Sequence, residues 1–432
     1  MEPCRRFSLL FCAGLLALAS LSGCGSSTTT ETIPSSATIL YAHSVIFRNQ
    51  STMTMGYNGF GQLGNGTLTS RSTAEIVPGL GRMQKGVAGA EHTMVFGNNS
   101  SVMTWGYNFY GQLGNGASGS NTFSSSPVKV PLHALVDDIA AGGFHSLAVA
   151  GGVINGWGYN VYGQVGNGTA TNAPTPVKIE TDIDDAPLGA ASQVAAGGTH
   201  SVALVNGSVY TWGNNASGQL GFNNFSAANL SIKKPRKVLS LPSTGGQVEQ
   251  IAAMGRSTLA LEVVRDGTGN ITGQTLWGWG YNGTGELGKD PATLPTSYQP
   301  VPVFSTVTAA DPIVIKKIAT GLNHLLLLLG LESTKNVSDG SWTVQALGFN
   351  FFGQLGNDTT VNSFTLVETL MTSTPRVVLT GVTDIAAFGN HSLALINGAW
   401  YGWGNNNMGQ LGSPPPASSA GNPKIPQLVL GF

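Results

Sequence analysis

Six histidines stand at one position of a recurring sequence pattern, and imidazole is the side chain most often used to bind metals in proteins. They are His43, His92, His145, His200, His324 and His391, with Arg256 at the corresponding place in the fifth copy. Equivalent positions in a ring of repeats lie too far apart for several imidazoles to reach one ion at about 2.1 Å. The pattern predicts half-buried imidazoles that hydrogen-bond to the backbone, and no metal site.

Two glycine clusters, at 59–64 and 283–288, match the Gly-x-Gly-x-x-Gly pattern of dinucleotide-binding loops. Turn residues follow each cluster, whereas that chemistry needs a helix whose N-terminus holds the pyrophosphate. The chain has no Gly-x-Ser-x-Gly motif for a nucleophilic serine, and acids such as Glu91 and Asp137 lack a repeated carboxylate partner. We therefore expect no cofactor and no catalysis. The alternative is an active site built from loops, which no motif would reveal.

Charge argues against a nucleic-acid partner. The formal net charge is -1, only 9% of residues are charged, and no run of Lys or Arg forms a phosphate-binding stripe. Glycine is abundant, with 60 residues, while apolar content is a normal 41%. This composition predicts a folded chain that uses glycine for turns and close packing.

The segment Gly-Gln-Leu-Gly or a close variant occurs seven times, and an asparagine stands three residues before each copy. Its bounding glycines are Gly61, Gly64, Gly111, Gly114, Gly163, Gly166, Gly218, Gly221, Gly285, Gly288, Gly353, Gly356, Gly409 and Gly412. A strand ending in Trp-Gly precedes it, with tryptophan at Trp105, Trp157, Trp212, Trp279 and Trp403, and with Met55 and Leu347 at that position in the first and sixth copies. We assign these residues structural roles in the repeat.

The elements that position these residues are short strands. A small-residue strand leads to each histidine, alternating apolar residues follow it, and hairpin signals such as Asn206-Gly207 join it to the Trp-Gly strand. Each copy ends in a Pro-x-x-Val-like strand, seen at Pro127, Pro176, Pro235 and Pro375. Four strands per copy and seven copies predict an all-β, seven-bladed propeller of four-stranded antiparallel blades. We expect the C-terminal strand, at 425–429, to close the ring by pairing with the N-terminal blade.

This order of motifs resembles the regulator of chromosome condensation repeat family, known for a seven-bladed propeller, over about residues 37–432. By family name alone, the resemblance implies nucleotide exchange on the small GTPase Ran. A further relative, the secreted bacterial propeller that inhibits β-lactamase, gives the alternative of an inhibitor of an envelope or extracellular enzyme.

The first residues predict the compartment. Two arginines, an apolar run at 7–19 and the tetrapeptide Leu-Ser-Gly-Cys at 21–24 resemble a bacterial lipoprotein signal. We expect removal of residues 1–23, lipidation of Cys24, and a flexible tether at 24–36 before a propeller at 37–432. The mature protein would be a monomer held in the bacterial cell envelope, at the outer membrane, and attached to the membrane by its lipid alone.

Two features predict a surface that binds a protein or a cell-envelope ligand. Aromatic residues recur beside the asparagine, and aromatics are favoured in interface cores; the other interpretation is packing between blades. The candidate binding residues are Tyr107, Tyr110, Tyr159, Tyr162, Tyr281 and Arg256. The second feature is four long loops, at 222–234, 264–275, 289–299 and 331–342, which carry specificity or reflect tolerated drift. We therefore expect a non-catalytic scaffold that binds through loops of one rim.

Overall fold

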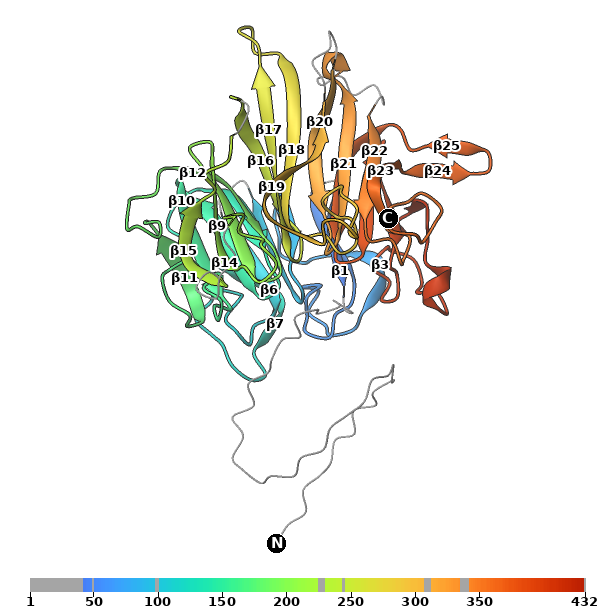
Figure 1. Ribbon diagram of the computed structural model, residues 1–432. Coiled ribbons are helices and arrows are strands. Elements are labelled where there is room, and N and C mark those ends of the chain that lie inside the picture. The colour runs from blue at the N-terminus through green and yellow to red at the C-terminus, as the bar shows by residue number, and fades with distance from the viewer. Residues whose placement is uncertain are drawn as a thin grey trace, which may run out of the picture. The chain divides into compact units, whose positions relative to one another are not determined.

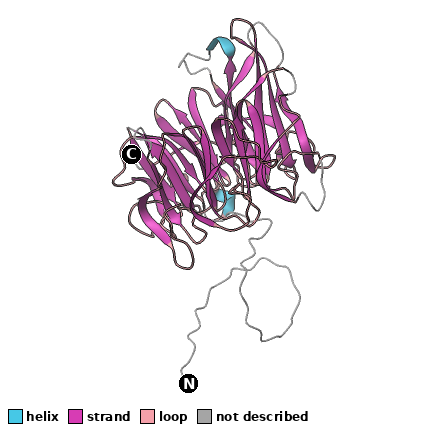
Figure 2. Ribbon diagram, turned by 90° about the vertical axis from the view of Figure 1, so that its left-hand side faces the viewer, coloured by secondary structure: helices cyan, strands magenta, loops and turns pink. Residues whose placement is uncertain are grey.

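The computed structural model of the chain describes residues 42–48, 50–97, 101–223, 230–242, 245–306, 312–334 and 342–430. All of them belong to the unit Ile39–Phe432. The expected signal peptide, Cys24 and the tether lie outside the described residues. The described part is almost entirely β-structure, with two short 3-10 turns, η2 (Glu332–Thr334) and η3 (Ser419–Gly421) (Figure 2). It contains no helix long and apolar enough to cross a membrane.

Seven antiparallel sheets form the blades of a propeller, which confirms the predicted fold (Figure 1). The first blade has three described strands and the other six have four. In blade order the strands are β1 (His43–Arg48), β2 (Ser51–Gly56), β3 (Arg71–Ile76); β4 (Met83–Ala88), β5 (His92–Gly97), β6 (Val102–Tyr107), β7 (Phe123–Lys129); β8 (Val136–Ala141), β9 (His145–Ala150), β10 (Val153–Gly158), β11 (Ala173–Ile179); β12 (Ala191–Ala196), β13 (His200–Val205), β14 (Ser208–Asn214), β15 (Ser231–Lys237); β16 (Gln247–Ala253), β17 (Ser257–Arg265), β18 (Ile271–Tyr281), β19 (Thr296–Ser305); β20 (Ile313–Thr320), β21 (His324–Leu331), β22 (Thr343–Gly348), β23 (Ser363–Glu368); β26 (Val382–Phe388), β27 (His391–Ile396), β28 (Ala399–Gly404), β29 (Gln427–Leu428).

A separate hairpin, β24 (Leu370–Ser373) and β25 (Arg376–Val378), follows the sixth blade and projects from the ring (Figure 1). Pro375 lies in the turn of this hairpin. Its assignment to the last strand of a blade was therefore wrong, because β23 fills that position.

The Gly-Gln-Leu-Gly loops follow the third strand of each blade and are built around the preceding asparagine. Asn58 is fully buried, and its Oδ1 accepts a hydrogen bond from the N–H of Leu63 at 2.9 Å; the same bond recurs in all seven copies at 2.8–3.0 Å. Gly61 has a φ of +79°, and a Cβ there would lie 2.5 Å from the Cα of Ser125 in the next blade. Glycine is therefore required both for the turn and for close packing of the blades.

The core lies between adjacent blades. The side chains of Trp105, Trp157, Trp212, Trp279 and Trp403 are completely buried. Trp157 of the third blade, for example, packs in one cluster with Met94 and Phe96 of the second blade. Neighbouring blades thus bury the faces that a single blade would expose.

The ring has two rims. We call the end at which strands β1, β5, β9, β13, β17, β21 and β27 begin the near rim, and the opposite end the far rim. The segment 264–275 joins the tall strands β17 and β18 of the fifth blade at the far rim (Figure 1). The described ends of 331–342, residues 331–334 and 342, lie at the far rim of the sixth blade, while residues 335–341 lie outside the described residues. The segment 289–299 connects the third to the fourth strand of the fifth blade at the near rim. The described parts of 222–234 lie before and in the start of β15 at the near rim of the fourth blade, while residues 224–229 lie outside the described residues. Strand direction thus places these long segments of neighbouring blades at opposite ends of the ring.

The C-terminal segment closes the ring, as expected, but with a different pairing. Strand β29 pairs with β28 of the seventh blade, so it does not form a mixed blade with the N-terminal strands. The contact with the first blade is made just beyond it, where the Leu430 carbonyl accepts a hydrogen bond from the N–H of Ala74 in β3 at 3.1 Å. The prediction that the C-terminal segment closes the ring was right, and the predicted pairing of its strand with the N-terminal blade was wrong.

Candidate functional site

The six repeated histidines are buried links between blades. Each is at most 1% exposed, and its Nε2 bonds to a hydroxyl at the start of the second strand of the next blade. The pairs are His43–Thr93 (2.6 Å), His92–Ser146 (3.0 Å), His145–Ser201 (2.9 Å), His200–Thr258 (2.9 Å), His324–Ser392 (2.9 Å) and His391–Ser44 (2.6 Å). The prediction of a bond to the backbone was therefore wrong, because the acceptor is a side-chain hydroxyl.

The same hydroxyl determines which ring nitrogen of the histidine carries the hydrogen. Ser201 donates its hydrogen to the backbone carbonyl of Gln164 at 2.7 Å, so its oxygen must accept from the Nε2–H of His145. The Gln164 carbonyl also accepts from the Trp212 indole at 2.9 Å. We call this His–hydroxyl–carbonyl chain the interblade relay. Its imidazoles are neutral, since burial lowers the pKa of His145 to about 3 and of His43 to about 4.

A glycine stands three residues before four of the relay histidines, and a Cβ there would meet the imidazole, whereas Phe388 stands at this position before His391. Gly142 lies so near His145 that a Cβ there would be 2.2 Å from Cε1 and 2.6 Å from the Gly197 carbonyl of the next blade. These histidines and glycines therefore serve blade packing. Within the described ranges, no group of three or more His, Cys, Asp or Glu side chains could hold a metal ion.

Arg256 does not occupy the histidine position. In the fourth blade His200 pairs with Gly213, whereas in the fifth blade Ser257 pairs with the equivalent Gly280. Arg256 therefore stands one residue before that position, on the near rim, and the alignment made from the sequence was wrong by one residue. The fifth copy has no histidine, so its sequence could not be aligned with the other copies at this position.

The boundary between the fifth and sixth blades lacks the relay entirely. Ser257 replaces histidine, Leu325 replaces the receiving hydroxyl, and Leu347 replaces tryptophan. The two leucines pack with Leu259 and Leu327 in an apolar cluster. Replacing both partners of a buried hydrogen bond with apolar groups is nearly neutral, whereas removing one partner is not. The taller strands add polar links here, with the Gln274 side chain accepting from the N–H of Ile315 at 2.6 Å.

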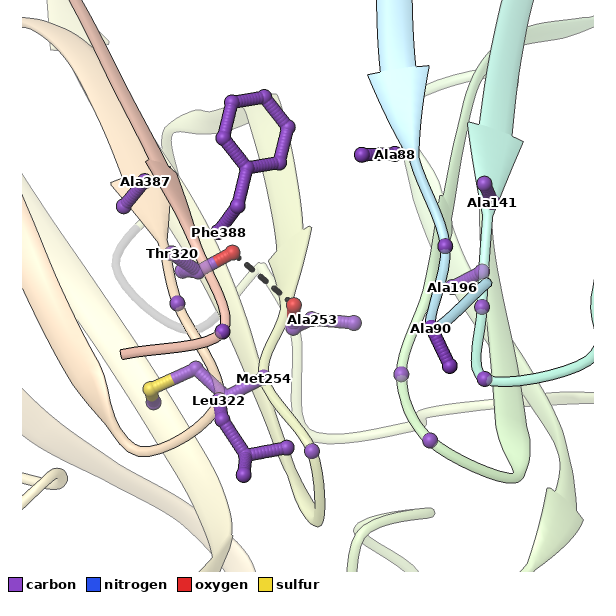
Figure 3. A pocket seen from close by; sticks show the side chains of 18 of the residues that line it. Ala88, Ala90, Ala141, Ala196, Ala253, Met254, Thr320, Leu322, Ala387 and Phe388 are labelled. Atoms are coloured by element: carbon purple, nitrogen blue, oxygen red, sulfur yellow. Dashed lines mark hydrogen bonds between the residues drawn. The ribbon is translucent and has the colours of Figure 1, made fainter. Parts of the chain in front are cut away.

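A small pocket lies where the innermost strands of the blades end. Its cavity measures about 100 Å³, and alanine and glycine residues from the blades line most of it. Figure 3 shows Phe388 and Leu322 on one side and Ala88 and Ala141 on the other. Thr320 donates to the Ala253 carbonyl at 2.9 Å, which ties the sixth blade to the fifth (Figure 3). The lining offers no cluster of ionisable groups for chemistry.

The near rim carries a continuous run of aromatic rings across the first three blades. Phe60 meets Tyr107 with ring centroids 4.7 Å apart, and Tyr110 meets Tyr159 at the same distance. Phe144 bridges Tyr107 at 5.9 Å and Tyr110 at 5.5 Å. We call the whole set the aromatic arc: Tyr57, Phe60, Tyr107, Phe109, Tyr110, Phe144, Tyr159 and Tyr162.

The arc combines packing with exposure. Tyr110 and Tyr159 are 7% and 8% exposed, while Phe60, Phe109 and Tyr162 are half-buried. Burial, with the neighbouring Tyr162 and Tyr110 hydroxyls, raises the pKa of Tyr159 to about 12, so its phenol stays neutral. The aromatics thus serve both packing between blades and a binding surface, because the buried rings support the half-buried ones.

Sequence reasoning found part of this surface. It named four arc tyrosines, and the structure places all four together; Tyr281 lies apart, in the fifth blade beside Arg256. It missed Phe109 and Phe144. Phe144 directly precedes a relay histidine, so its place on the rim follows from the repeat alignment, whereas its contacts to two blades required the fold.

Comparisons with known proteins identify the repeat. A model described as the regulator of chromosome condensation (RCC1) repeat matches residues 99–149, 152–204 and 206–261, and a second model of that description matches 191–219. Each long match begins near a Trp-Gly strand and ends in the next histidine strand. A sequence repeat therefore contributes strands to two successive blades, which links neighbours covalently.

Among curated proteins, the chain is 28% identical to the ultraviolet-B receptor UVR8 of Arabidopsis thaliana over 82% of this chain and 72% of that protein. It is 31% identical to human HERC6, named a probable E3 ubiquitin-protein ligase, over 53% of this chain. That match spans only 20% of HERC6.

Solved structures share the fold. Yeast RCC1 (Prp20), crystallised bound to Kap60, gives a TM-score of 0.68 at 21% identity, covering 91% of this chain and 84% of the other. Human WBSCR16 gives 0.65 at 24% identity, covering 83% and 85%. The protein is thus a seven-bladed propeller that contains regulator of chromosome condensation (RCC1) repeats, matched at residues 99–149, 152–204 and 206–261.

Proposed function

We propose that the protein is a non-catalytic scaffold of the bacterial cell envelope, held by a lipid on Cys24, which binds a protein partner on the near rim through the aromatic arc. The observation that carries this proposal is the arc itself. Eight rings from three blades form a chain of neighbouring contacts on one rim, and six of them are half-buried, so part of their surface reaches solvent.

The physical properties of the arc suit protein recognition. Tyrosine and phenylalanine give large contact areas with little conformational freedom to lose, and binding surfaces of antibodies use tyrosine together with small polar residues for this reason. The buried Tyr110 and Tyr159 hold their neighbours in place before a partner arrives. A preorganised surface loses less entropy on binding than a loop that must first become ordered.

The similar yeast protein supports a protein as partner, since it was crystallised bound to Kap60. That likeness concerns the fold, so the partner here is inferred from the arc. The anchor rests on the sequence at 21–24, which resembles a lipoprotein signal.

A photo-crosslinking amino acid at Val161 tests the proposal. Val161 is 51% exposed and lies between Tyr159 and Tyr162 of the arc. The matched control is Leu239, which is 85% exposed and follows β15 at the far rim. In cells that carry the lipidated protein, we expect one or a few discrete protein adducts from position 161 and none of them from position 239.

The same adducts from both positions, or none from position 161, would contradict binding by the arc. Incorporation of a palmitate analogue tests the anchor separately, and labelling that persists after Cys24→Ala would remove Cys24 from the proposal.

A further inference from the structure

Arg256 occupies a position of the near rim that recurs in every blade. In each blade the carbonyl of this residue accepts a hydrogen bond from the residue after Trp-Gly or its equivalent. The seven residues at this position are Ala42, Glu91, Phe144, Thr199, Arg256, Asn323 and Asn390. Arg256 is the one cation among these seven described residues, and it shares its rim with the aromatic arc.

The guanidinium of Arg256 stacks on the ring of Tyr281, whose backbone is held in place by hydrogen bonds. Its Cζ lies 3.9 Å from the centroid of the Tyr281 ring. The Tyr281 backbone is held at both ends, because its N–H donates to the Arg256 carbonyl at 3.0 Å and its carbonyl accepts from the Ser257 hydroxyl at 2.6 Å. A cation stacked on such a ring loses less freedom when it binds an anion.

Gly283 makes this stacking possible. A Cβ at Gly283 would lie 2.1 Å from the Tyr281 hydroxyl oxygen and 2.3 Å from its Cζ. The close atoms belong to the far end of one side chain, so alanine at this position would displace the Tyr281 ring and leave the backbone in place. The first blade repeats the arrangement, with a Cβ at Gly59 falling 2.1 Å from the Tyr57 hydroxyl oxygen.

Arg256 retains its hydrogen-bonding capacity. Its guanidinium makes no hydrogen bond or ion pair with any residue of the described ranges. The nearby Glu286 carboxyl is 1% exposed, and its Oε2 accepts from the N–H and the hydroxyl of Thr284 at 2.8 and 2.9 Å. Burial raises the pKa of Glu286 to about 7, despite the opposing effect of its hydrogen bonds and of Arg256. The arginine is therefore only partly neutralised from within the protein.

We infer that Arg256, stacked on Tyr281, is a subsite for a carboxylate, and that the partner on the aromatic arc places an aspartate or glutamate side chain there. The inference rests on the proposed function for the partner's nature. The five N–H donors of arginine match the two oxygens of a carboxylate in a planar, bidentate pair. Tyrosine and arginine are also among the residue types enriched at the hot spots of protein interfaces.

The test needs neither the partner nor the anchor. Phenylglyoxal modifies free arginines, and mass spectrometry reports the modification rate at Arg256. The α-amide of N-acetyl-aspartate, whose one carboxylate is the side chain, should slow modification of Arg256 several-fold at constant ionic strength, while its neutral isostere, the α-amide of N-acetyl-asparagine, should not. Arg265 is the internal control, because Glu249 already pairs with it through two hydrogen bonds, and its rate should not respond.

Two matched variants separate the subsite from general effects of charge. Gly283→Ala should abolish the protection of Arg256, whereas Gly59→Ala, which displaces the equivalent ring far from any arginine of this rim position, should leave it intact. Equal protection by both probes, protection only by inorganic phosphate, or full protection in Gly283→Ala would overturn the inference. If Arg256 is protected but crosslinking from Val161 yields no adduct, the carboxylate subsite stands and the proposed partner on the arc does not.

Discussion

Lowering the pH from 7.5 to 5.0 should destabilise the ring by on the order of 10 kcal/mol, enough to unfold a typical domain. The cause is the interblade relay. Burial lowers the pKa of its imidazoles from 6.5 to about 4 for His43 and to about 3 for the other five. Each buried ring is held neutral, with its Nε2–H already donated to a hydroxyl.

The sign follows from where the protons bind. Below pH 6.5 the unfolded chain protonates these histidines and the folded ring does not, so the free energy of unfolding falls until the pH reaches about 3–4. At pH 5 each histidine costs about 2 kcal/mol, and six give the sum above. Glu286 acts in the opposite direction, since its raised pKa adds stability below pH 7. One carboxyl cannot offset six imidazoles.

Urea titrations at pH 7.5, 6.5 and 5.5 measure this effect as the slope of unfolding free energy against pH. Replacing one relay histidine, as in His145→Gln, should lower the slope near pH 5.5 by close to one proton. Glu286→Gln should steepen the fall between pH 7.5 and 5.5, because the opposing group is gone. A stability that is flat from pH 7.5 to 5.0 would contradict the neutral, buried relay.

The second large effect is expected at Gly142. Alanine there would place its Cβ 2.2 Å from the His145 ring and 2.6 Å from the Gly197 carbonyl, so the third and fourth blades must separate locally. Overpacking of this kind costs about 1–3 kcal/mol. Side chains do occur at this position in two other blades. The fifth blade has Met254 there with Ser257 in place of histidine, and the seventh has Phe388 beside a retained His391, where β26 and β27 pair as far as these two residues.

The matched experiment is a double-mutant cycle with His145→Ser. In that background Gly142→Ala should cost clearly less than it does alone, because the nearest clashing atoms are gone. Urea midpoints for the four proteins give the coupling energy. Additive costs would show that the glycine is required for a reason other than the imidazole.

The propeller was predictable because its markers serve local geometry. Asn58 and Gly61 fix a loop whose hydrogen bonds lie within a few residues, so the pattern survives in all seven copies and identifies the blade. The relay was not predictable, because each histidine bonds to a hydroxyl at least 50 residues away in the next blade. Ser257, Leu325 and Leu347 replace the histidine, the hydroxyl and the tryptophan of one relay. That these three replacements belong together is visible only when the fifth and sixth blades are placed side by side.

The candidate site divides in the same way. Tyrosine positions beside the asparagine were visible as a pattern, whereas their continuity through Phe144 depends on contacts between blades. Which rim a long loop joins depends on the direction of the preceding strand. The connection between β17 and β18 therefore lies at the far rim, whereas the loop at 289–299 of the same blade lies at the near rim.

The central claim, that the partner binds the arc on the near rim, is tested most directly by comparing two variants against the protein captured from Val161. One variant carries Phe60→Ser, Phe109→Ser and Tyr162→Ser, which are half-buried and spare the buried Tyr110 and Tyr159. The other replaces residues 265–271 at the far-rim end of β17–β18 with an Asn-Gly turn. We predict at least a 100-fold loss of affinity, about 3 kcal/mol, for the first and no measurable loss for the second. Full affinity in the arc variant together with a large loss in the truncated hairpin would contradict the account.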